Sequence, residues 1–320
     1  MFRGRWDFAA IALGLVLLLA LPFLLNPYYT SIAIFVGIYT IVTVGLCLLM
    51  GYTGQVSLGQ AAFYGLGAYI SAILSKSYGV SPWLAMAIAA LVTGGFAYIV
   101  GVPILKLKGN YLAMATLGLG IITYIVFREA EHFTGGQTGL PGIPYLSVFG
   151  FVFNTDKKYY YLVWAFCLAI LLISQNIVNS RTGRALKAIR DSEIAAESIG
   201  IDVAKLKVKV FSLSAVYASL AGSLYVHYIT YISPQPFDFL FSVRLLVMAA
   251  VGGLASIWGA IFGTATVSLL GETLHSVGEL ETIAFGFVLM VTVIFLPRGL
   301  WVSLVGWLKE KKYYTEGKRR

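Results

Sequence analysis

Long apolar stretches with almost no charge follow one another along most of the chain. Between Phe8 and Leu105 the only charged side chain is Lys76. A helix that crosses a bilayer needs about 20 largely apolar residues. Segments of this kind occupy residues 8–25, 31–50, 58–75, 83–104, 110–128, 160–178, 210–231, 241–256, 259–275 and 282–297. The pattern predicts an all-α, polytopic integral membrane protein with eight to ten transmembrane helices, ten being the preferred number.

The composition excludes a soluble domain. Hydrophobic residues make up 59% of the 320 residues and charged residues only 12%, and the mean hydropathy is +0.84. Soluble domains carry about 25% charged residues because they must present a wet surface. The net charge of +9 is therefore interpreted as a topology signal and not as a nucleic-acid-binding surface. Cys47 and Cys167 both lie in apolar segments, so we expect packing roles and neither a disulfide nor a metal site.

The distribution of Lys and Arg predicts the orientation in the membrane. Ten spans place both termini on one side, and with the termini in the cytoplasm 18 of the 23 Lys and Arg residues fall on the inner side. Cytoplasmic segments carry such an excess in most membrane proteins. We therefore predict a single transmembrane domain over 1–308 and a basic cytoplasmic tail over 309–320. The main loops are an extracytoplasmic loop at about 129–159 and a cytoplasmic loop at about 180–209.

Two glycine-rich segments interrupt the apolar pattern at corresponding places. The first glycine segment, residues 51–60, lies between predicted spans two and three, and the second glycine segment, residues 252–259, lies between spans eight and nine. Paired interruptions suggest a weak internal repeat and a transport pathway, although glycine also lets membrane helices pack closely. The residues alone leave both interpretations open. The candidate pathway residues are Gly51, Tyr52, Thr53, Gly54, Gln55, Ser57, Gly59, Gln60, Gly252, Gly253, Ser256 and Gly259.

The cytoplasmic loop carries signals for two short helices. The first is predicted over 183–190 and the second over 193–199. Asp191 or Ser192 is placed to cap the second helix, whose N-terminal end begins with an acidic residue. Gly200 is placed to end it in the left-handed conformation.

The same loop presents a short apolar stripe among its charges, formed by Leu186, Ile189, Ile194 and Ile199. A stripe this short is not expected to form a core of its own. It is expected to lie in a groove of a partner protein or on lipid headgroups. The alternative is a solvated basic loop on the inner membrane face, which would need neither the caps nor the stripe.

The sequence offers little for chemistry in this chain. It contains no Gly-x-x-x-x-Gly-Lys-Ser/Thr phosphate loop, so any ATPase activity is expected in another chain. It shows no clustered nucleophile, carboxylate pair or metal set, which argues against an intramembrane enzyme. An ion-coupled secondary transporter usually carries ionisable residues near the midplane, and most spans here have none. A channel stays open as an alternative, and the cytoplasmic loop is the feature that speaks against it.

Six motifs follow one another in order over nearly the whole chain. They are GYTGQVSLGQAAFYG at 51–65, KGNYLAMATLG at 108–118, TGGQTGLPGIP at 134–144, the loop at 181–201, GGLASIWG at 252–259 and FLPRGL at 295–300. With these motifs the chain resembles the inner-membrane permease subunits of bacterial and archaeal ABC transporters for branched-chain amino acids. More narrowly, it resembles the M-type permease of the high-affinity leucine, isoleucine and valine system.

The resemblance implies a multi-pass transport subunit of the cell membrane and no enzyme activity in this chain. The implied partners are a second homologous permease, two cytoplasmic ATPases that bind ATP and Mg, and an extracytoplasmic solute-binding protein, which we expect at 135–144. No cofactor is implied for this chain. The substrate is expected to be a branched-chain amino acid moved by alternating access, while related permeases carry urea or short amides. The implied ATPase-coupling residues are Arg184, Lys187, Arg190, Glu193, Ala196 and Gly200.

Overall fold

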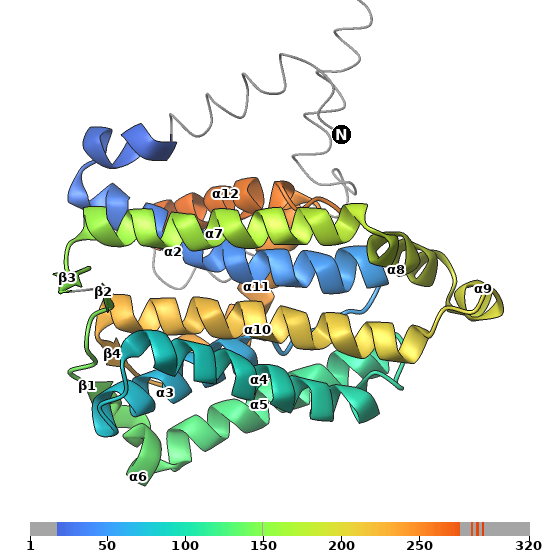
Figure 1. The fold of residues 1–320 in the computed structure, drawn as a ribbon, viewed down its shortest axis with the longest axis horizontal. Helices are drawn as coiled ribbons and strands as arrows, with labels where there is room; N and C mark the ends of the chain where they lie inside the picture. Colours follow the sequence, from blue (N-terminus) through green and yellow to red (C-terminus); the bar gives the residue numbers. More distant parts are fainter. Residues whose placement is uncertain (1–17, 149, 276–282, 284–285, 288–289, 291–320) are drawn as a thin grey trace, which may run out of the picture.

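The computed structural model describes residues 18–148 and 150–275, together with 283, 286, 287 and 290. The longer helices are α2 (Pro27–Leu46), α3 (Gln60–Ser77), α4 (Pro82–Ile104), α5 (Asn110–Glu129), α7 (Asp156–Asn179), α10 (Val203–Ile229), α11 (Phe239–Gly252) and α12 (Gly259–His275). The shorter ones are the π-helix η1 (Cys47–Tyr52), α6 (Glu131–Thr134), η2 (Gly136–Thr138), α8 (Arg181–Asp191), α9 (Glu193–Ser198) and η3 (Gln235–Phe237). Figure 1 shows that helices dominate the described part of the chain.

Five helices in the described residues are long and apolar enough to cross a membrane: α2 with η1, α4, α5, α7 and α10. They match the predicted spans at 31–50, 83–104, 110–128, 160–178 and 210–231. Helix α3 confirms that the segment predicted at 58–75 is helical, but its Gln, Ser and Lys residues lower its hydropathy and it is not one of these five helices. Residues 8–17 of predicted span 8–25 lie outside the described residues, and so does predicted span 282–297 apart from residues 283, 286, 287 and 290.

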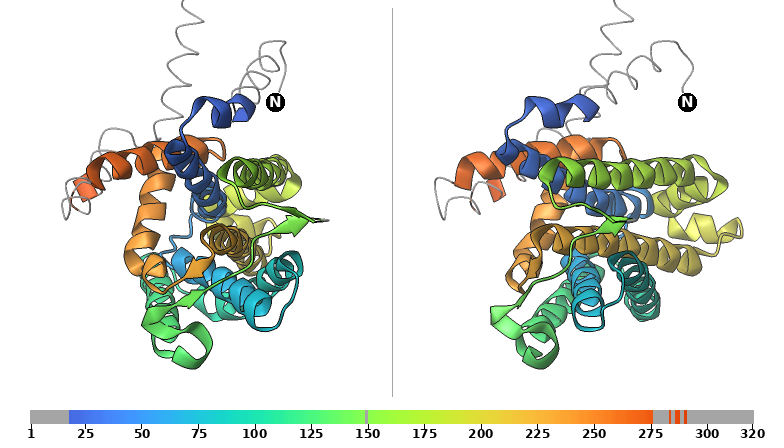
Figure 2. Two further views of the ribbon diagram at one scale, coloured as in Figure 1. Left: turned by 90° about the vertical axis from the view of Figure 1, so that its left-hand side faces the viewer. Right: turned by 60° about the vertical axis from the view of Figure 1, so that its left-hand side comes forward.

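The helix in the segment predicted at 241–256 is shorter than predicted and ends at the interruption predicted at 252–259. Helix α11 ends at Gly252 after 14 residues, which is about 21 Å at 1.5 Å per residue and too short to span a bilayer upright. Gly253 follows with φ of 101°, a conformation that favours glycine. Figure 2 shows α11 running across the direction of α10.

Helix α10 forms the centre of the helical bundle and packs against α2, α3 and α4. In the most apolar stretch of α10, 72% of the residues are buried, whereas in that of α5 only 22% are buried. The large exposed apolar side chains of α4 and α5 therefore face either lipid or another membrane protein. Figure 1 shows α2, α4, α7 and α10 running side by side, with α8 and α9 at one end of the bundle.

Helices α3 and α10 pack closely against each other through glycines. A Cβ atom on Gly222 would lie 1.9 Å from the carbonyl oxygen of Tyr64, and one on Gly67 would lie 2.3 Å from the Cα of Ser219. The Ser223 hydroxyl also donates to the Gly67 carbonyl oxygen across this contact, at 3.2 Å. Small residues allow such close approach in membrane bundles, where packing and interhelical hydrogen bonds replace the hydrophobic effect.

The end of the bundle opposite to α8 and α9, called the loop end here, carries two short antiparallel ribbons. Strand β1 (Leu140–Pro141) pairs with β4 (Tyr231–Ile232), and β2 (Ser147–Val148) pairs with β3 (Phe151–Val152). The loop between α5 and α7 is hydrogen-bonded to α10 through His227, whose Nδ1 lies 2.7 Å from the Pro144 carbonyl oxygen. Because a carbonyl oxygen only accepts, Nδ1 carries a proton there. The Ser71 hydroxyl lies 2.8 Å from Nε2 of the same ring.

Candidate functional site

Helices α8 and α9, called the α8–α9 unit below, have the local structure that the sequence predicts. The Ser180 hydroxyl caps α8 by accepting from the Gly183 amide at 3.4 Å, and the Ser192 hydroxyl caps α9 by accepting from the Ala195 amide at 3.3 Å. Gly200 adopts φ of 82°, as predicted for a helix terminator. Two short helices with Ser192 as the cap of the second are therefore confirmed, with α8 beginning two residues earlier than expected.

The predicted apolar stripe does not form one face of the unit. Leu186 and Ile189 are buried, whereas Ile194 and Ile199 are 76% and 74% exposed. Ile189 packs with Ala196 and Val203 in a small separate cluster. The stripe forms no core by itself, as expected, but only half of it is left for a partner or for lipid, because Leu186 packs in the main core and Val203 of α10 covers Ile189.

Two basic side chains of α8 reach from the unit to the first glycine segment. The Arg190 guanidinium donates from Nη1 to the Gly51 carbonyl oxygen at 2.7 Å. Lys187 Nζ lies 5.8 Å from the centre of the Tyr52 ring, within the range of a cation–π contact. The Gly51 carbonyl lies in the last turn of η1, where a helix leaves its carbonyl groups without intrahelical partners. Arg190 therefore satisfies a group that the end of a helix exposes.

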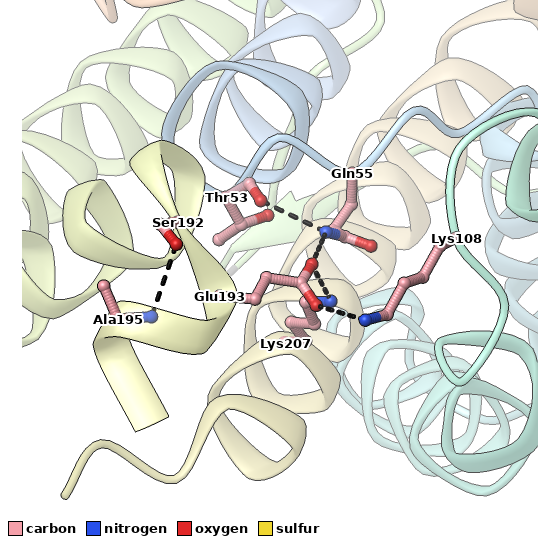
Figure 3. A network of polar contacts seen from close by, with 7 residues as sticks. All are labelled: Thr53, Gln55, Lys108, Ser192, Glu193, Ala195 and Lys207. Atoms are coloured by element: carbon pink, nitrogen blue, oxygen red, sulfur yellow. Dashed lines mark hydrogen bonds and ion pairs between the residues drawn. The ribbon is translucent and has the colours of Figure 1, made fainter. Parts of the chain in front are cut away.

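Glu193, the first residue of α9, is the centre of a polar network shown in Figure 3. Its Oε1 pairs with the buried ammonium of Lys207, and its Oε2 lies 3.7 Å from Lys108 Nζ. Gln55 Nε2 donates to Glu193 Oε1 at 3.4 Å and to the Thr53 carbonyl oxygen at 3.2 Å. The network therefore joins α9, α10, the loop before α5 and the first glycine segment.

The electrostatics of Glu193 favour its charged form. Burial by itself raises the pKa of this carboxyl, but the hydrogen bond and charge of Lys207, the charge of Lys108 and the hydrogen bond from Gln55 outweigh it and lower the pKa below its usual value. The carboxylate is thus ionised at neutral pH, and the ion pair with Lys207 is present there.

The first glycine segment continues α2 as a π-helix and then runs without regular structure to α3. Gly54 turns the chain with φ of 71°. The Leu58 amide donates to the Thr116 hydroxyl at 3.0 Å, and a Cβ on Gly59 would lie 2.6 Å from the Thr116 carbonyl oxygen. Glycine at position 59 therefore lets the segment lie directly against α5.

The two glycine segments touch each other, although about 200 residues separate them. A Cβ on Gly51 would lie 1.8 Å from the Leu254 carbonyl oxygen. The Tyr52 hydroxyl donates to the Ala255 carbonyl oxygen at 2.8 Å. Within the second segment, a Cβ on Gly252 would lie 2.2 Å from the Gly259 carbonyl oxygen. A chain of contacts therefore runs from α8 through the first glycine segment to the second.

Comparison with known proteins identifies the family. A family model described as the permease component of branched-chain amino acid transport systems matches residues 28–297. The chain belongs to this family. It is therefore a multi-pass membrane transport component and not an enzyme.

Several relatives are similar to this permease over most of its length. The high-affinity branched-chain amino acid permeases LivM of Salmonella typhimurium and Escherichia coli are each 29% identical to it over 328 residues, covering 95% of this chain and 77% of theirs. LivH of Escherichia coli is 21% identical over 282 residues, covering 82% and 90%. A solved structure, PsaBC from Streptococcus pneumoniae in complex with Fab, superposes with a TM-score of 0.45 and 16% identity, covering 88% of this chain and 95% of that chain.

The remaining predicted residues of the permease fall into two groups. Arg184 and Gly200 are exposed on the α8–α9 unit, where a partner can reach them, whereas Ala196 is buried and cannot be a docking contact. Ser57 is buried and accepts from the Gly59 amide at 3.5 Å, and Ser256 accepts from the Gly259 amide at 3.0 Å. Gln60 points away from this contact chain, since its Nε2 donates to the Ser214 hydroxyl at 3.0 Å.

The sequence analysis missed Lys108, Lys207 and Thr116 as parts of the site. Thr116 entered only as a member of the motif at 108–118, Lys108 as a member of that motif and as an orientation signal, and Lys207 only as an orientation signal, because a lysine in a basic loop has no pattern that marks it as buried. Lys207 is nevertheless only 4% exposed and paired with Glu193. The one available signal was the acidic residue at the start of α9, which needs a cation when it is partly buried.

Proposed function

We propose that this permease is one membrane-spanning half of an ATP-driven importer for leucine, isoleucine and valine. In this proposal it has ten transmembrane helices with both termini in the cytoplasm of a bacterial or archaeal cell. It works with a second homologous permease, two ATPases that bind ATP and Mg, and an extracytoplasmic solute-binding protein. The chain itself binds no cofactor. The observation that carries the proposal is the contact chain from the α8–α9 unit to both glycine segments.

The mechanism follows from how that contact chain is fixed. The α8–α9 unit is covalently continuous with α7 and α10, and hydrogen bonds from Arg190 and Gln55 tie it to the first glycine segment. A movement of the unit driven by ATPase closure therefore pulls on Gly51. The Tyr52 hydroxyl passes the movement to Ala255 in the second segment. Alternating access requires such a bistable region, which the ATP state biases toward one arrangement.

The ATPases are proposed to dock on the exposed part of the α8–α9 unit. Ile194 and Ile199 are large apolar side chains that are three-quarters exposed on a short element surrounded by charges. An apolar anchor with a charged rim is the composition of a docking surface. Arg184 and Glu197 are exposed on the same two helices and belong to that rim.

The test is uptake by the whole complex in proteoliposomes. We expect leucine uptake that requires ATP and the binding protein, with urea and acetamide as competing substrates without effect. The double variant Ile194→Asp, Ile199→Asp is expected to lose the ATPases on purification and to lower uptake at least tenfold, because apolar anchors carry most of the docking energy. Lys209→Asp is the matched control, since it places an acid on an exposed position of α10.

Three results would count against parts of the proposal. Uptake that proceeds without ATP would indicate a secondary transporter or a channel. Full retention of the ATPases by the double variant would move the docking surface away from α9. Uptake of urea in place of leucine would assign the other substrate class while leaving the coupling intact.

A further inference from the structure

A cavity of about 340 Å³ lies at the loop end of the bundle, at the end opposite to the α8–α9 unit. It is bounded by the start of α2, the start of α7 and the end of α10, and its lining includes Tyr145 and Phe153 of the loop between α5 and α7. Helix α7, with 24 residues, separates the two ends by about 36 Å. The cavity is therefore distinct from the contact chain described above. Its volume falls in the range of small-molecule sites.

The lining combines aromatic rings with a single charged group. The rings belong to Phe35, Tyr145, Phe153 and Tyr228, and the charged group is the carboxylate of Asp156. The Phe35 and Tyr228 rings meet edge to face with centroids 5.8 Å apart, so the wall is rigid at this point. A pocket with ring faces and one negative charge is suited to a cation and rejects an anion.

The Asp156 carboxylate is held in place but has no cationic partner among the described residues. The Tyr228 hydroxyl donates to Oδ1 at 2.9 Å and also lies 3.0 Å from the Ser31 hydroxyl. The two neighbouring lysines are directed to other rings: Lys157 Nζ lies 5.3 Å from the centre of Phe23, and Lys158 Nζ lies 4.4 Å from that of Phe151. No ion pair of the described residues includes Asp156.

We propose that this cavity binds the ammonium group of a small aliphatic amino acid. The ammonium donates to Asp156 and lies against the Phe35 and Tyr228 rings, and the aliphatic part packs on Phe153 and Ile229. The choice of an amino acid over a simple amine rests on the proposed function. The site then receives substrate at the loop end before it moves toward the glycine segments.

The experiment is saturation-transfer difference NMR on the purified full complex in nanodiscs, without the binding protein. Three probes of similar shape distinguish binding through the ammonium group from binding through the carboxylate group. They are L-leucine with both groups, 3-methylbutylamine with only the ammonium, and 4-methylpentanoate with only the carboxylate. We expect signals from leucine and the amine and none from the carboxylate. Asp156→Asn keeps the size of the side chain and is expected to weaken binding of the amine at least tenfold, since a charge-assisted hydrogen bond is lost. Glu131→Gln, an exposed acid of the same loop end, is the control and is expected to bind as wild type does.

Binding of 4-methylpentanoate as strong as that of the amine would overturn the proposal, and so would unchanged amine binding by Asp156→Asn. These results are separable from a failure of the proposed function. ATP-driven leucine uptake with unchanged amine binding by Asp156→Asn overturns the cavity assignment alone. Amine binding that depends on Asp156, in a complex that shows no ATP-driven uptake, overturns the proposed function alone.

Discussion

Substituting Gly51→Ala is expected to reduce ATP-driven leucine uptake by about two orders of magnitude or more. The new Cβ would lie 1.8 Å from the Leu254 carbonyl oxygen and 2.5 Å from its carbonyl carbon, and both are backbone atoms. No side-chain rotation relieves such an overlap, so the two glycine segments must separate. Alanine favours a helix over glycine by only about 1 kcal/mol, which is far too little to offset it. The contact chain then breaks at its central point.

Gly95→Ala is the control for this substitution. Gly95 lies inside helix α4 and, unlike Gly51, is exposed, so a Cβ there meets no atom within 4 Å. It is expected to leave uptake unchanged. Uptake, the yield of folded complex and the amount of bound ATPase are measured for both variants. Because the α8–α9 unit still presents Ile194 and Ile199, the Gly51→Ala complex is expected to retain its ATPases. Normal uptake by Gly51→Ala would show that the two segments need not touch during transport.

The parts of the site that the sequence predicts are those set by local signals. A serine hydroxyl at the start of α9 and a glycine at its end satisfy backbone groups within a few residues, so Ser192 and Gly200 could be placed without knowledge of the fold. The basic residues of α8 could be assigned to one side of the membrane for a similar reason, because charge next to an apolar span is a local pattern. Their contacts with Gly51 and Tyr52 could not be predicted in the same way.

The parts that sequence reasoning missed depend on which elements meet in space. Ile189 and Ile194 have the same apolar character, but only Ile189 is covered, since Val203 of α10 lies against it and Ala196. The span predicted at 241–256 extends four residues too far, because apolar residues continue past Gly252 while the backbone turns at Gly253. Both glycine segments were recognised as helix interruptions. Their mutual contact left no mark in either segment, because glycine at such a contact looks the same as glycine at a helix crossing.

Glu193 and Lys207 are expected to respond unequally to neutralisation. Lys207 has a side chain only 4% exposed, whereas that of Glu193 is 26% exposed and also near Lys108. Glu193→Leu leaves a buried ammonium without a partner and is expected to destabilise the complex by on the order of 3 kcal/mol. Lys207→Met leaves a carboxylate that water and Lys108 still reach, so this variant is expected to destabilise the complex less than Glu193→Leu does. Thermal unfolding of the purified complex measures the loss of stability in both variants. Glu197→Gln, which changes an exposed acid of the same helix, is the control.

The pH dependence of this pair has a defined sign. Because the fold lowers the pKa of Glu193, its contribution to stability is fully present above the ordinary pKa of a glutamate. The contribution is lost as the pH falls through the lowered value. We therefore expect no change in the stability difference between wild type and Glu193→Leu from pH 6 to pH 8, and a decreasing difference in strongly acidic buffer. A difference that changes near pH 7 would mean that another group controls the pair.

The double variant Glu193→Leu, Lys207→Met separates stability from coupling. Replacing both members of a buried ion pair by apolar residues is often neutral for stability, so the double variant is expected to unfold near the wild-type temperature. It still lacks the carboxylate that accepts from Gln55, so the tie between α9 and the first glycine segment is missing. We therefore expect intact complexes in which ATP hydrolysis continues while leucine uptake falls at least tenfold. If uptake recovers together with stability, Glu193 serves only to hold α9 against α10, and Arg190 is left as the hydrogen-bonded connection between the α8–α9 unit and the first glycine segment.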